Sequence, residues 1–145
     1  MSELVLSEIV VGLVAFLDQD QLNGDPEVHK SLPQRYGCLR PFVCVWSDRG
    51  ESQWLPLTTK MRPERLRIER PWRSGGEVCW RIGDEHYLND GANVYTGPSS
   101  RFVAASHSER TTARNRARLS SEGIAAILVE IERQRHRRQD EGDAA

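Results

Sequence analysis

The stretch "GCLRPFVCVWSDRGESQWLPLTTK", residues 37–60, decides the fold of this chain. It holds two apolar runs, 41–46 and 53–57, joined by the polar residues 47–52. The joining segment contains Gly50, which suits a left-handed turn position. Two strand-sized runs around such a segment are typical of an antiparallel hairpin, here with a loop of roughly six residues.

The two ends of this hairpin carry polar side chains. Arg40 precedes Pro41, which restricts the Arg40 backbone to an extended shape and begins the strand where no ladder donor is lost. Thr58, Thr59 and Lys60 follow the second run. Both ends of a hairpin lie at one rim of the sheet, so we expect a guanidinium and a hydroxyl to meet there. Such a pair is suited to stabilising charge on a phosphoryl group. The alternative is an arginine that ends a strand and threonines that favour β structure.

Outside the hairpin, the chain shows further strand-sized runs. Residues 9–17 are a buried strand or a short buried helix, which periodicity does not separate, and their valines favour the strand. Pro56 favours an edge or a bulge for its own strand. Further strands are predicted at 65–69, 78–82 and 101–106, with loops or turns at 18–36, 70–77 and 83–93.

The pattern changes to a helical one at residues 120–138. Apolar residues recur there at the spacing of one helix face, and Ser120 or Ser121 is a candidate N-cap. Several strands followed by one helix predict an α+β domain, mainly β, built as a small antiparallel barrel with a C-terminal helix. It covers residues 1–139, and a disordered tail is expected at 140–145. The apolar stripe consists of Ile124, Ile127, Leu128 and Ile131.

Composition limits the function classes. The 145 residues carry 20 basic and 21 acidic side chains, so bulk charge does not indicate nucleic acid as a partner. Residues 101–138 contain nine arginines and four glutamates. This excess of arginine favours contacts with phosphate or carboxylate groups. Alternatively, it reflects only a genome that encodes arginine in place of lysine. Three cysteines without a C-x-x-C pair argue against a disulfide framework and a zinc site, so neither metal nor cofactor is expected. The run 9–17 is too short to span a membrane and lacks signal-peptide features, which predicts a cytoplasmic protein without membrane contact.

The segments G-C-L-R-P-F-V-C-V and W-L-P-L-T-T-K resemble the PemK/MazF family of toxin endoribonucleases. The specific part of the resemblance covers residues 37–60, and the rest agrees in the order of elements. The resemblance implies an SH3-like barrel, a homodimer and a type II toxin–antitoxin system with a small antitoxin protein as partner. It also implies cleavage of single-stranded RNA without a metal ion.

By this resemblance Arg40 is the catalytic arginine and Thr58 the catalytic hydroxyl, with Thr59 as its neighbour. His29 is the histidine placed closest before the motif and is a candidate acid–base group. The predicted substrate-binding residues are Lys60, Arg73 and the turn residue Trp72, which offers a stacking surface for a base.

Two other functions remain open from the sequence. The first is a catalytically inactive barrel of the same class that binds a protein, as gyrase-poisoning toxins do. The second is a nucleic-acid-binding regulatory or phage protein that uses the arginines of 110–118 and 133–138. Cleavage of RNA separates the ribonuclease from both alternatives.

Overall fold

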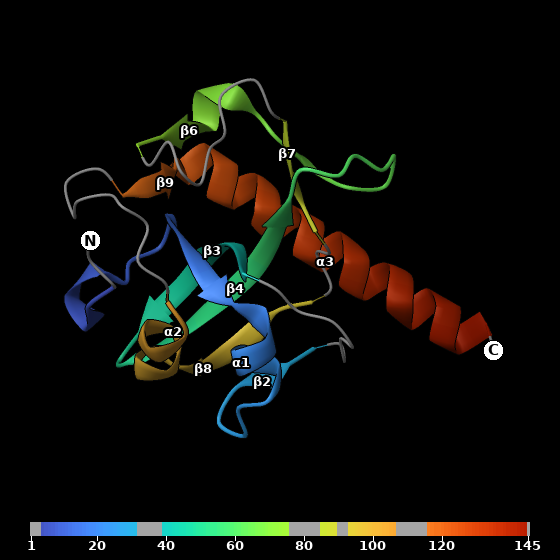
Figure 1. Cartoon of the computed structure of the whole chain (residues 1–145). Helices are drawn as coiled ribbons and strands as arrows, with labels where there is room; N and C mark the ends of the chain where they lie inside the picture. The colour runs from blue at the N-terminus through green and yellow to red at the C-terminus, as the bar shows by residue number, and fades with distance from the viewer. Residues whose placement is uncertain (1–3, 32–38, 76–84, 90–92, 107–115, 145) are drawn as a thin grey trace.

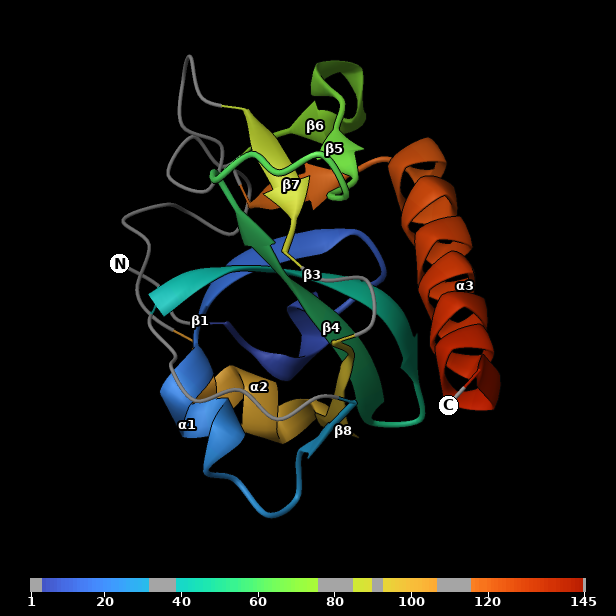
Figure 2. The same ribbon diagram turned by 90° about the vertical axis from the view of Figure 1, so that its right-hand side faces the viewer.

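The computed structural model describes residues 4–31, 39–75, 85–89, 93–106 and 116–144. Antiparallel strands form one sheet between two helical layers. Figure 2 shows the long C-terminal helix along one side of the sheet and two short helices on the other side. The architecture is therefore α+β and mainly β, with a C-terminal helix, as the sequence predicts.

Three helices, two 3-10 turns and nine strands make up the described residues. The helices are α1 (Gln19–Asn23), α2 (Ser99–Ala105) and α3 (Ser121–Ala144), with 3-10 turns at Leu6–Glu8 and Arg70–Trp72. The first strands are β1 (Leu13–Asp18), β2 (His29–Lys30), β3 (Leu39–Asp48) and β4 (Glu51–Thr58). The later strands are β5 (Arg67–Ile68), β6 (Arg73–Ser74), β7 (His86–Leu88), β8 (Tyr95–Pro98) and β9 (Ala117–Leu119).

The strand order places the hairpin at the centre of the sheet. The order is β2-β8-β4-β3-β1-β9-β6, and β7 pairs with β4 and β5 as a side branch (Figure 1). Within the described parts of the chain, no pairing joins β2 to β6, so the sheet is open there. Closure into a barrel stays a prediction.

The hairpin is tighter than the sequence predicts. Arg49 (φ 49°) and Gly50 (φ 82°) form a two-residue turn, and both adopt left-handed backbone conformations. The residues on either side pair with each other through the backbone, Asp48 with Glu51 and Ser47 with Ser52. The expected loop of roughly six residues is therefore wrong, because polar side chains do not prevent their backbones from joining a ladder.

Pro56 lies in an interior strand. On one side β4 pairs with β3. On the other side it pairs with β8 from Glu51 to Trp54 and with β7 from Leu57 onward. Pro56 belongs to neither of these two outer ladders, so its missing N–H removes no bond from them.

Two hydrophobic cores lie on the two faces of the sheet. The first packs strand residues such as Val43 and Leu57 against Ile124, Ile127 and Ile131 of α3. The fourth residue of the predicted stripe, Leu128, is exposed instead. The second core lies against the short helices and includes Leu22 of α1, Phe102 of α2, Phe42, Trp54 and Tyr95.

The segment predicted as the loop 18–36 contains regular structure. Asp18 caps α1 by accepting a hydrogen bond from the Gln21 amide at 3.1 Å, and β2 follows at His29–Lys30. The loop prediction is thus wrong for these residues, because the aspartate that begins the "DQDQLN" segment caps a helix rather than continuing a loop. Residues 32–36 lie outside the described part of the chain.

Two further predictions require correction. The predicted strand 101–106 is largely helix α2, whose buried residues Ser99, Phe102 and Ala105 recur with helical spacing. The predicted loop 83–93 contains β7. The strand predicted at 78–82 lies outside the described residues.

Helix α3 begins as predicted. Ser120 is its cap, since the Ser120 hydroxyl accepts a hydrogen bond from the Gly123 amide at 3.3 Å. The helix then continues to Ala144, through most of the segment for which a disordered tail was expected. No helix among the described residues has the length and apolar character needed to cross a membrane.

Candidate functional site

The candidate site lies where β3 begins and β4 ends. The β3–β4 ladder runs from Asp48–Glu51 at the turn to Phe42–Pro56 at the far end. Arg40 and Thr58 each lie two residues beyond this last pair. Continuing the register places both residues in one column, on the face of the sheet that Phe42 and Pro56 share. The structure thus places the two predicted catalytic residues at one end of the hairpin and on one face.

A β-bulge in β3 sets this register. On the turn side of the bulge Trp46 pairs with Gln53, whereas beyond it Cys44 pairs with Trp54. One extra residue of β3, Val45, is therefore accommodated between these pairs. Without the bulge, the register of the turn side would bring Thr59 rather than Thr58 opposite Arg40.

Different strands hold the two residues beyond the last β3–β4 pair. Arg40 pairs with Leu17 of β1, and Thr58 pairs with Tyr87 of β7. The ends of β3 and β4 thus separate as β4 leaves to pair with β7, which Figure 2 shows as β4 running toward β7.

Arg40 lies beside a buried polar cluster. The Tyr95 hydroxyl accepts a hydrogen bond from the Gln19 side chain at 3.0 Å and donates one to Asn23 Oδ1 at 2.8 Å. Burial raises the pKa of Tyr95, and the neighbouring Gln19, Asn93, Arg40 and Asn23 partly offset this shift. Arg40 itself is half-buried and is close enough to Tyr95 for its charge to act on the phenol.

Thr58 is oriented by the turn that follows it. Its hydroxyl oxygen accepts a hydrogen bond from the Lys60 amide at 3.2 Å. Arg65 in turn donates to the Lys60 carbonyl at 2.7 Å. The predicted substrate-binding Lys60 is exposed and Thr59 is exposed beside it, whereas Thr58 is half-buried. The Thr58 oxygen keeps acceptor capacity and its proton, which suits contact with a phosphate oxygen.

His29 does not lie at this site. It pairs with Thr96 of β8, which pairs with Gln53 of β4. Gln53 precedes Thr58 by about 16 Å of strand. Moreover, the next residue, Lys30, reaches Asn23 beside the polar cluster, so alternation turns His29 to the opposite face. The geometry therefore gives no support to His29 as the acid–base group for Arg40 and Thr58.

Trp72 and Arg73 have structural contacts. Trp72 is partly buried against the core that includes α3, and its carbonyl accepts a hydrogen bond from the Ser120 amide at 2.8 Å. The Arg73 side chain is 8% exposed, donates to the Ile68 carbonyl at 2.7 Å and contacts Glu85. Neither side chain is presented openly to a substrate.

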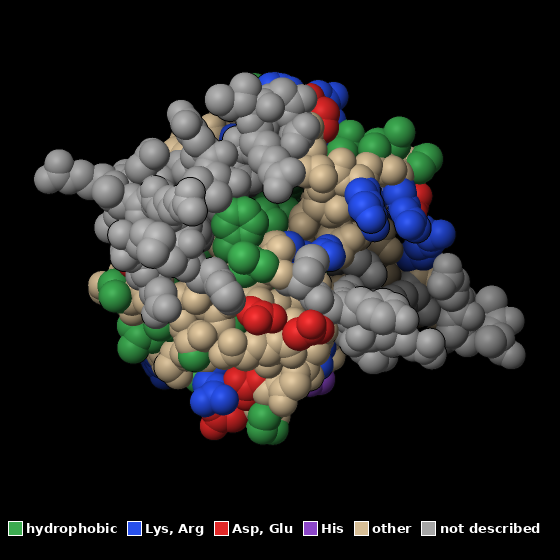
Figure 3. Space-filling model, in the orientation of Figure 1, with side chains coloured by type: hydrophobic (Ala, Val, Ile, Leu, Met, Phe, Trp, Pro, Cys, Tyr) green, Lys and Arg blue, Asp and Glu red, His purple; other side chains and the backbone are tan. Residues whose placement is uncertain are grey.

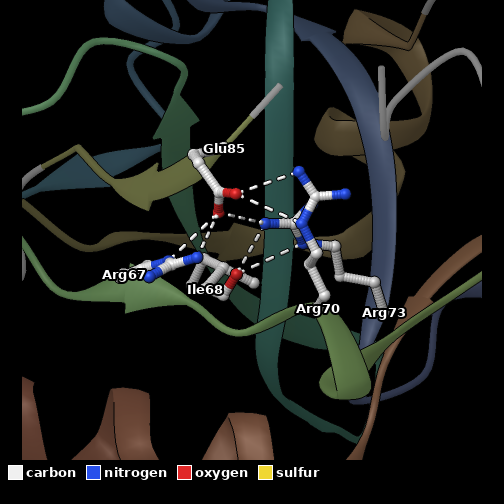
Figure 4. A network of polar contacts seen from close by, with 5 residues as sticks. All are labelled: Arg67, Ile68, Arg70, Arg73 and Glu85. Carbon is white, nitrogen blue, oxygen red and sulfur yellow. Dashed lines mark hydrogen bonds and ion pairs between the residues drawn. The ribbon is translucent and has the colours of Figure 1, made fainter. Parts of the chain in front are cut away.

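Three arginines surround one glutamate near β5 and β7. Figure 4 shows Arg67 approaching Glu85 from one side, and Arg70 and Arg73 from the other. The shortest distances to the carboxylate are 3.0 Å from Arg67, 2.9 Å from Arg70 and 3.4 Å from Arg73. Hydrogen bonds from Arg70 and Arg67 lower the pKa of Glu85, although burial opposes the shift. This cluster was not predicted, although the spacing of arginines in "RLRIERPWR" was a signal for it.

A pocket of about 210 Å³ lies elsewhere, between the β4–β5 loop and α3. Lys and Arg side chains gather in this part of the molecule, at the right of Figure 3. The pocket wall itself balances Arg62 and Arg65 with Glu64 and Glu130, so it has no excess positive charge. Arg40 and Thr58 are not part of it.

Among the described residues, no group of three or more His, Cys, Asp or Glu side chains is arranged to hold a metal ion. Cys44 is buried, and this burial raises the pKa of its thiol to about 12, while Cys38 and Cys79 lie outside the described residues. Comparison of the chain with protein-family models, curated proteins and solved structures finds no match in any of the three.

Proposed function

We propose that this chain is the toxin component of a type II toxin–antitoxin system and a metal-independent endoribonuclease that cleaves single-stranded RNA in the cytoplasm. The observation that carries the proposal is the position of Arg40 and Thr58 at one end of the hairpin, each two residues beyond the last β3–β4 pair. Antiparallel strands and a C-terminal helix are elements that the motif resemblance implies, and their closure into an SH3-like barrel is part of the proposal.

The proposed reaction uses the RNA's own 2′-hydroxyl as nucleophile. Its oxygen attacks the adjacent phosphorus, the bond to the 5′-oxygen breaks, and the products are a 2′,3′-cyclic phosphate and a 5′-hydroxyl. The proton lost from the 2′-hydroxyl is balanced by the proton gained by the leaving oxygen. Arg40 stabilises the additional negative charge on the phosphorane, and Thr58 donates a hydrogen bond to one of its oxygens.

The proposal includes a homodimer and a small antitoxin as partners. Apolar side chains remain exposed on the outer surface of α3 and on β3. They are Leu128 and Val129 on the helix and Trp46 on the strand, with exposed fractions of 46%, 69% and 40%. Burial of these side chains in an interface would stabilise an association.

The test is cleavage of a mixed-sequence RNA in the presence of a chelator. The wild-type protein should cut, and Arg40→Ala should lose cleavage while keeping its melting temperature within a few degrees. Arg40→Lys should also fail, because lysine keeps the charge but lacks the planar fork. Arg49→Asn is the matched control, since Arg49 is exposed at the turn, at the opposite end of the hairpin from Arg40, and asparagine tolerates its left-handed backbone. Undiminished cleavage by Arg40→Ala would move the active site elsewhere, and RNA binding without any cleavage would favour a binding protein.

A further inference from the structure

A row of side chains leads away from Thr58 across the side branch of the sheet. Thr58 pairs with Tyr87, and Tyr87 pairs with Arg67. Directly paired residues of antiparallel strands point to the same face. Neighbouring strands lie about 4.8 Å apart, so the backbones of Thr58 and Arg67 are about 10 Å apart.

This row lies on the outer face of the branch. The alternate residues on the same strands form the inner face, where they are buried in the first core or against it. These inner residues are Leu57, Leu88, Ile68 and His86. Tyr87 is half-buried and Arg67 is exposed. The row therefore faces solvent beside Thr58, the candidate catalytic threonine.

The far end of the row carries accessible positive charge. Arg67 and Arg70 have side chains that are 50% and 54% exposed, although both contact Glu85. Besides Glu85, the carboxylate of Glu69 also acts on Arg67. With Arg73, three guanidinium groups thus face two carboxylates among the described residues, which leaves one positive charge in excess there. A phosphodiester carries one negative charge and matches the fork of a guanidinium.

Tyr87 lies between the hydroxyl and the guanidinium groups. Its phenol is near enough to act electrostatically on Arg67. An aromatic ring between two phosphate-binding groups suits single-stranded nucleic acid, because a base can stack on the ring while the neighbouring phosphates contact the polar and cationic groups.

We propose that Thr58, Tyr87 and Arg67, together with Arg70, form a binding track for single-stranded RNA. In this track Tyr87 stacks a base, and the two arginines bind a phosphate next to the one held at Thr58. Glu85 keeps the arginines extended across the track and shares them with the incoming phosphate. The inference rests on the proposed function, because it takes Thr58 as the site of cleavage.

The test measures binding of a 2′-O-methyl oligoribonucleotide of mixed sequence, which the proposed reaction does not cleave, by fluorescence anisotropy at several salt concentrations. The double variant Arg67→Ala/Arg70→Ala should bind at least tenfold more weakly, with a salt slope that is less steep by about 0.7 for each phosphate that the protein no longer neutralises. Tyr87→Ala should bind about tenfold more weakly with an unchanged slope, and Tyr87→Phe should bind as the wild type does. Glu85→Gln should bind severalfold more tightly, because a competing negative charge is removed.

Arg49→Asn at the hairpin turn is the matched control and should bind normally, since Arg49 is exposed at the opposite end of the hairpin and asparagine tolerates its left-handed backbone. Unchanged binding by both the double variant and Tyr87→Ala would overturn the track, as would the absence of binding by the wild type. If the double variant melts at a much lower temperature, its weaker binding could come from unfolding. The binding of Glu85→Gln and Tyr87→Ala then tests the track in its place. Wild-type binding without cleavage of ordinary RNA would refute the ribonuclease and leave the track standing. Cleavage that is unaffected by the track substitutions would refute the track and leave the ribonuclease standing.

Discussion

The β3–β4 register, continued beyond its last pair, brings Thr58 to the level of Arg40 because β3 carries an extra residue between its pairs with Gln53 and Trp54. The bulge thus selects which of two adjacent threonines lies in the column of the arginine. Thr59 lies beyond the last residue of β4, in the bend that follows, and is exposed. A local irregularity far from the open end of the hairpin therefore determines the composition of the candidate site.

The two threonines should differ in their effect on RNA cleavage. Thr58→Ala should lower the cleavage rate by about a hundredfold, the typical loss for one donor to a developing oxyanion. Thr59→Ala should stay close to the wild-type rate, since its hydroxyl lies outside the column. Single-turnover rates at saturating protein give the comparison, and Thr58→Ser should recover most of the activity. Equal loss in both alanine variants would contradict the register argument.

The sequence predicted the hairpin because its strands are long, apolar and bounded by polar residues. It did not predict the two-residue turn or the bulge, since both depend on how two backbones meet rather than on side-chain type. The β7 strand was missed because only His86–Leu88 pair, too few residues for an alternating pattern. Helix α2 was missed because "RFVAAS" is short and suits either state.

The candidate site was predictable only in part. Arg40 and Thr58 follow from the motif and from the fact that hairpin ends share a rim. Tyr87 and Glu85 do not, because they come from a segment that reads as a loop and meet Arg67 only through tertiary pairing. His29 precedes the motif closely in the sequence, but β2 carries it to β8 and away from the column.

Gly12 should tolerate substitution less well than Gly50. Gly12 has φ 97°, and an added Cβ would lie 2.6 Å from the Leu119 carbonyl oxygen. Gly50 has φ 82°, and an added Cβ there meets nothing within 4 Å. Gly50→Ala should cost about 1 kcal/mol of unfolding free energy, from backbone conformation alone. Gly12→Ala should cost at least about 3 kcal/mol, because a backbone clash is added. Urea denaturation measures both, and equal costs would show that β9 moves aside freely.

The ion pair of Glu8 and Arg116 should make stability depend on acid pH. Arg116 is 1% exposed and donates to Glu8 from Nε at 2.8 Å, although 108 residues separate the two in sequence. Burial opposes the charged form of Glu8, but hydrogen bonds from Arg116 and the Val5 amide outweigh it and lower its pKa below 4.5. The unfolded chain therefore binds this proton more readily than the folded one, so the contribution is full above about pH 4.5 and is lost as the pH falls through the folded pKa.

Comparison with Glu8→Gln isolates this contribution from the other carboxylates whose pKa is lowered, Asp25, Glu85 and Glu130. At neutral pH the variant should be less stable by about 2 kcal/mol, the value of a hydrogen bond to a charged group. The difference from the wild type should shrink as the pH is lowered below 4.5. A difference that stays constant down to acid unfolding would show that the ion pair does not respond to pH in this way.

Tyr95 should position Arg40 without touching RNA itself. Its hydroxyl is buried among Gln19, Asn23 and the charge of Arg40, so Tyr95→Phe leaves the two amide side chains without their shared partner. The unfolding free energy should fall by about 1–3 kcal/mol. Well below the melting temperature, kcat for RNA cleavage should fall while KM stays near the wild-type value, because the substrate-binding track is intact and only the arginine is less well held. Tyr87→Phe is the matched control, since it removes a phenolic hydroxyl from a half-buried position and should change neither constant. An unchanged kcat in Tyr95→Phe would show that the hairpin alone holds Arg40 in place.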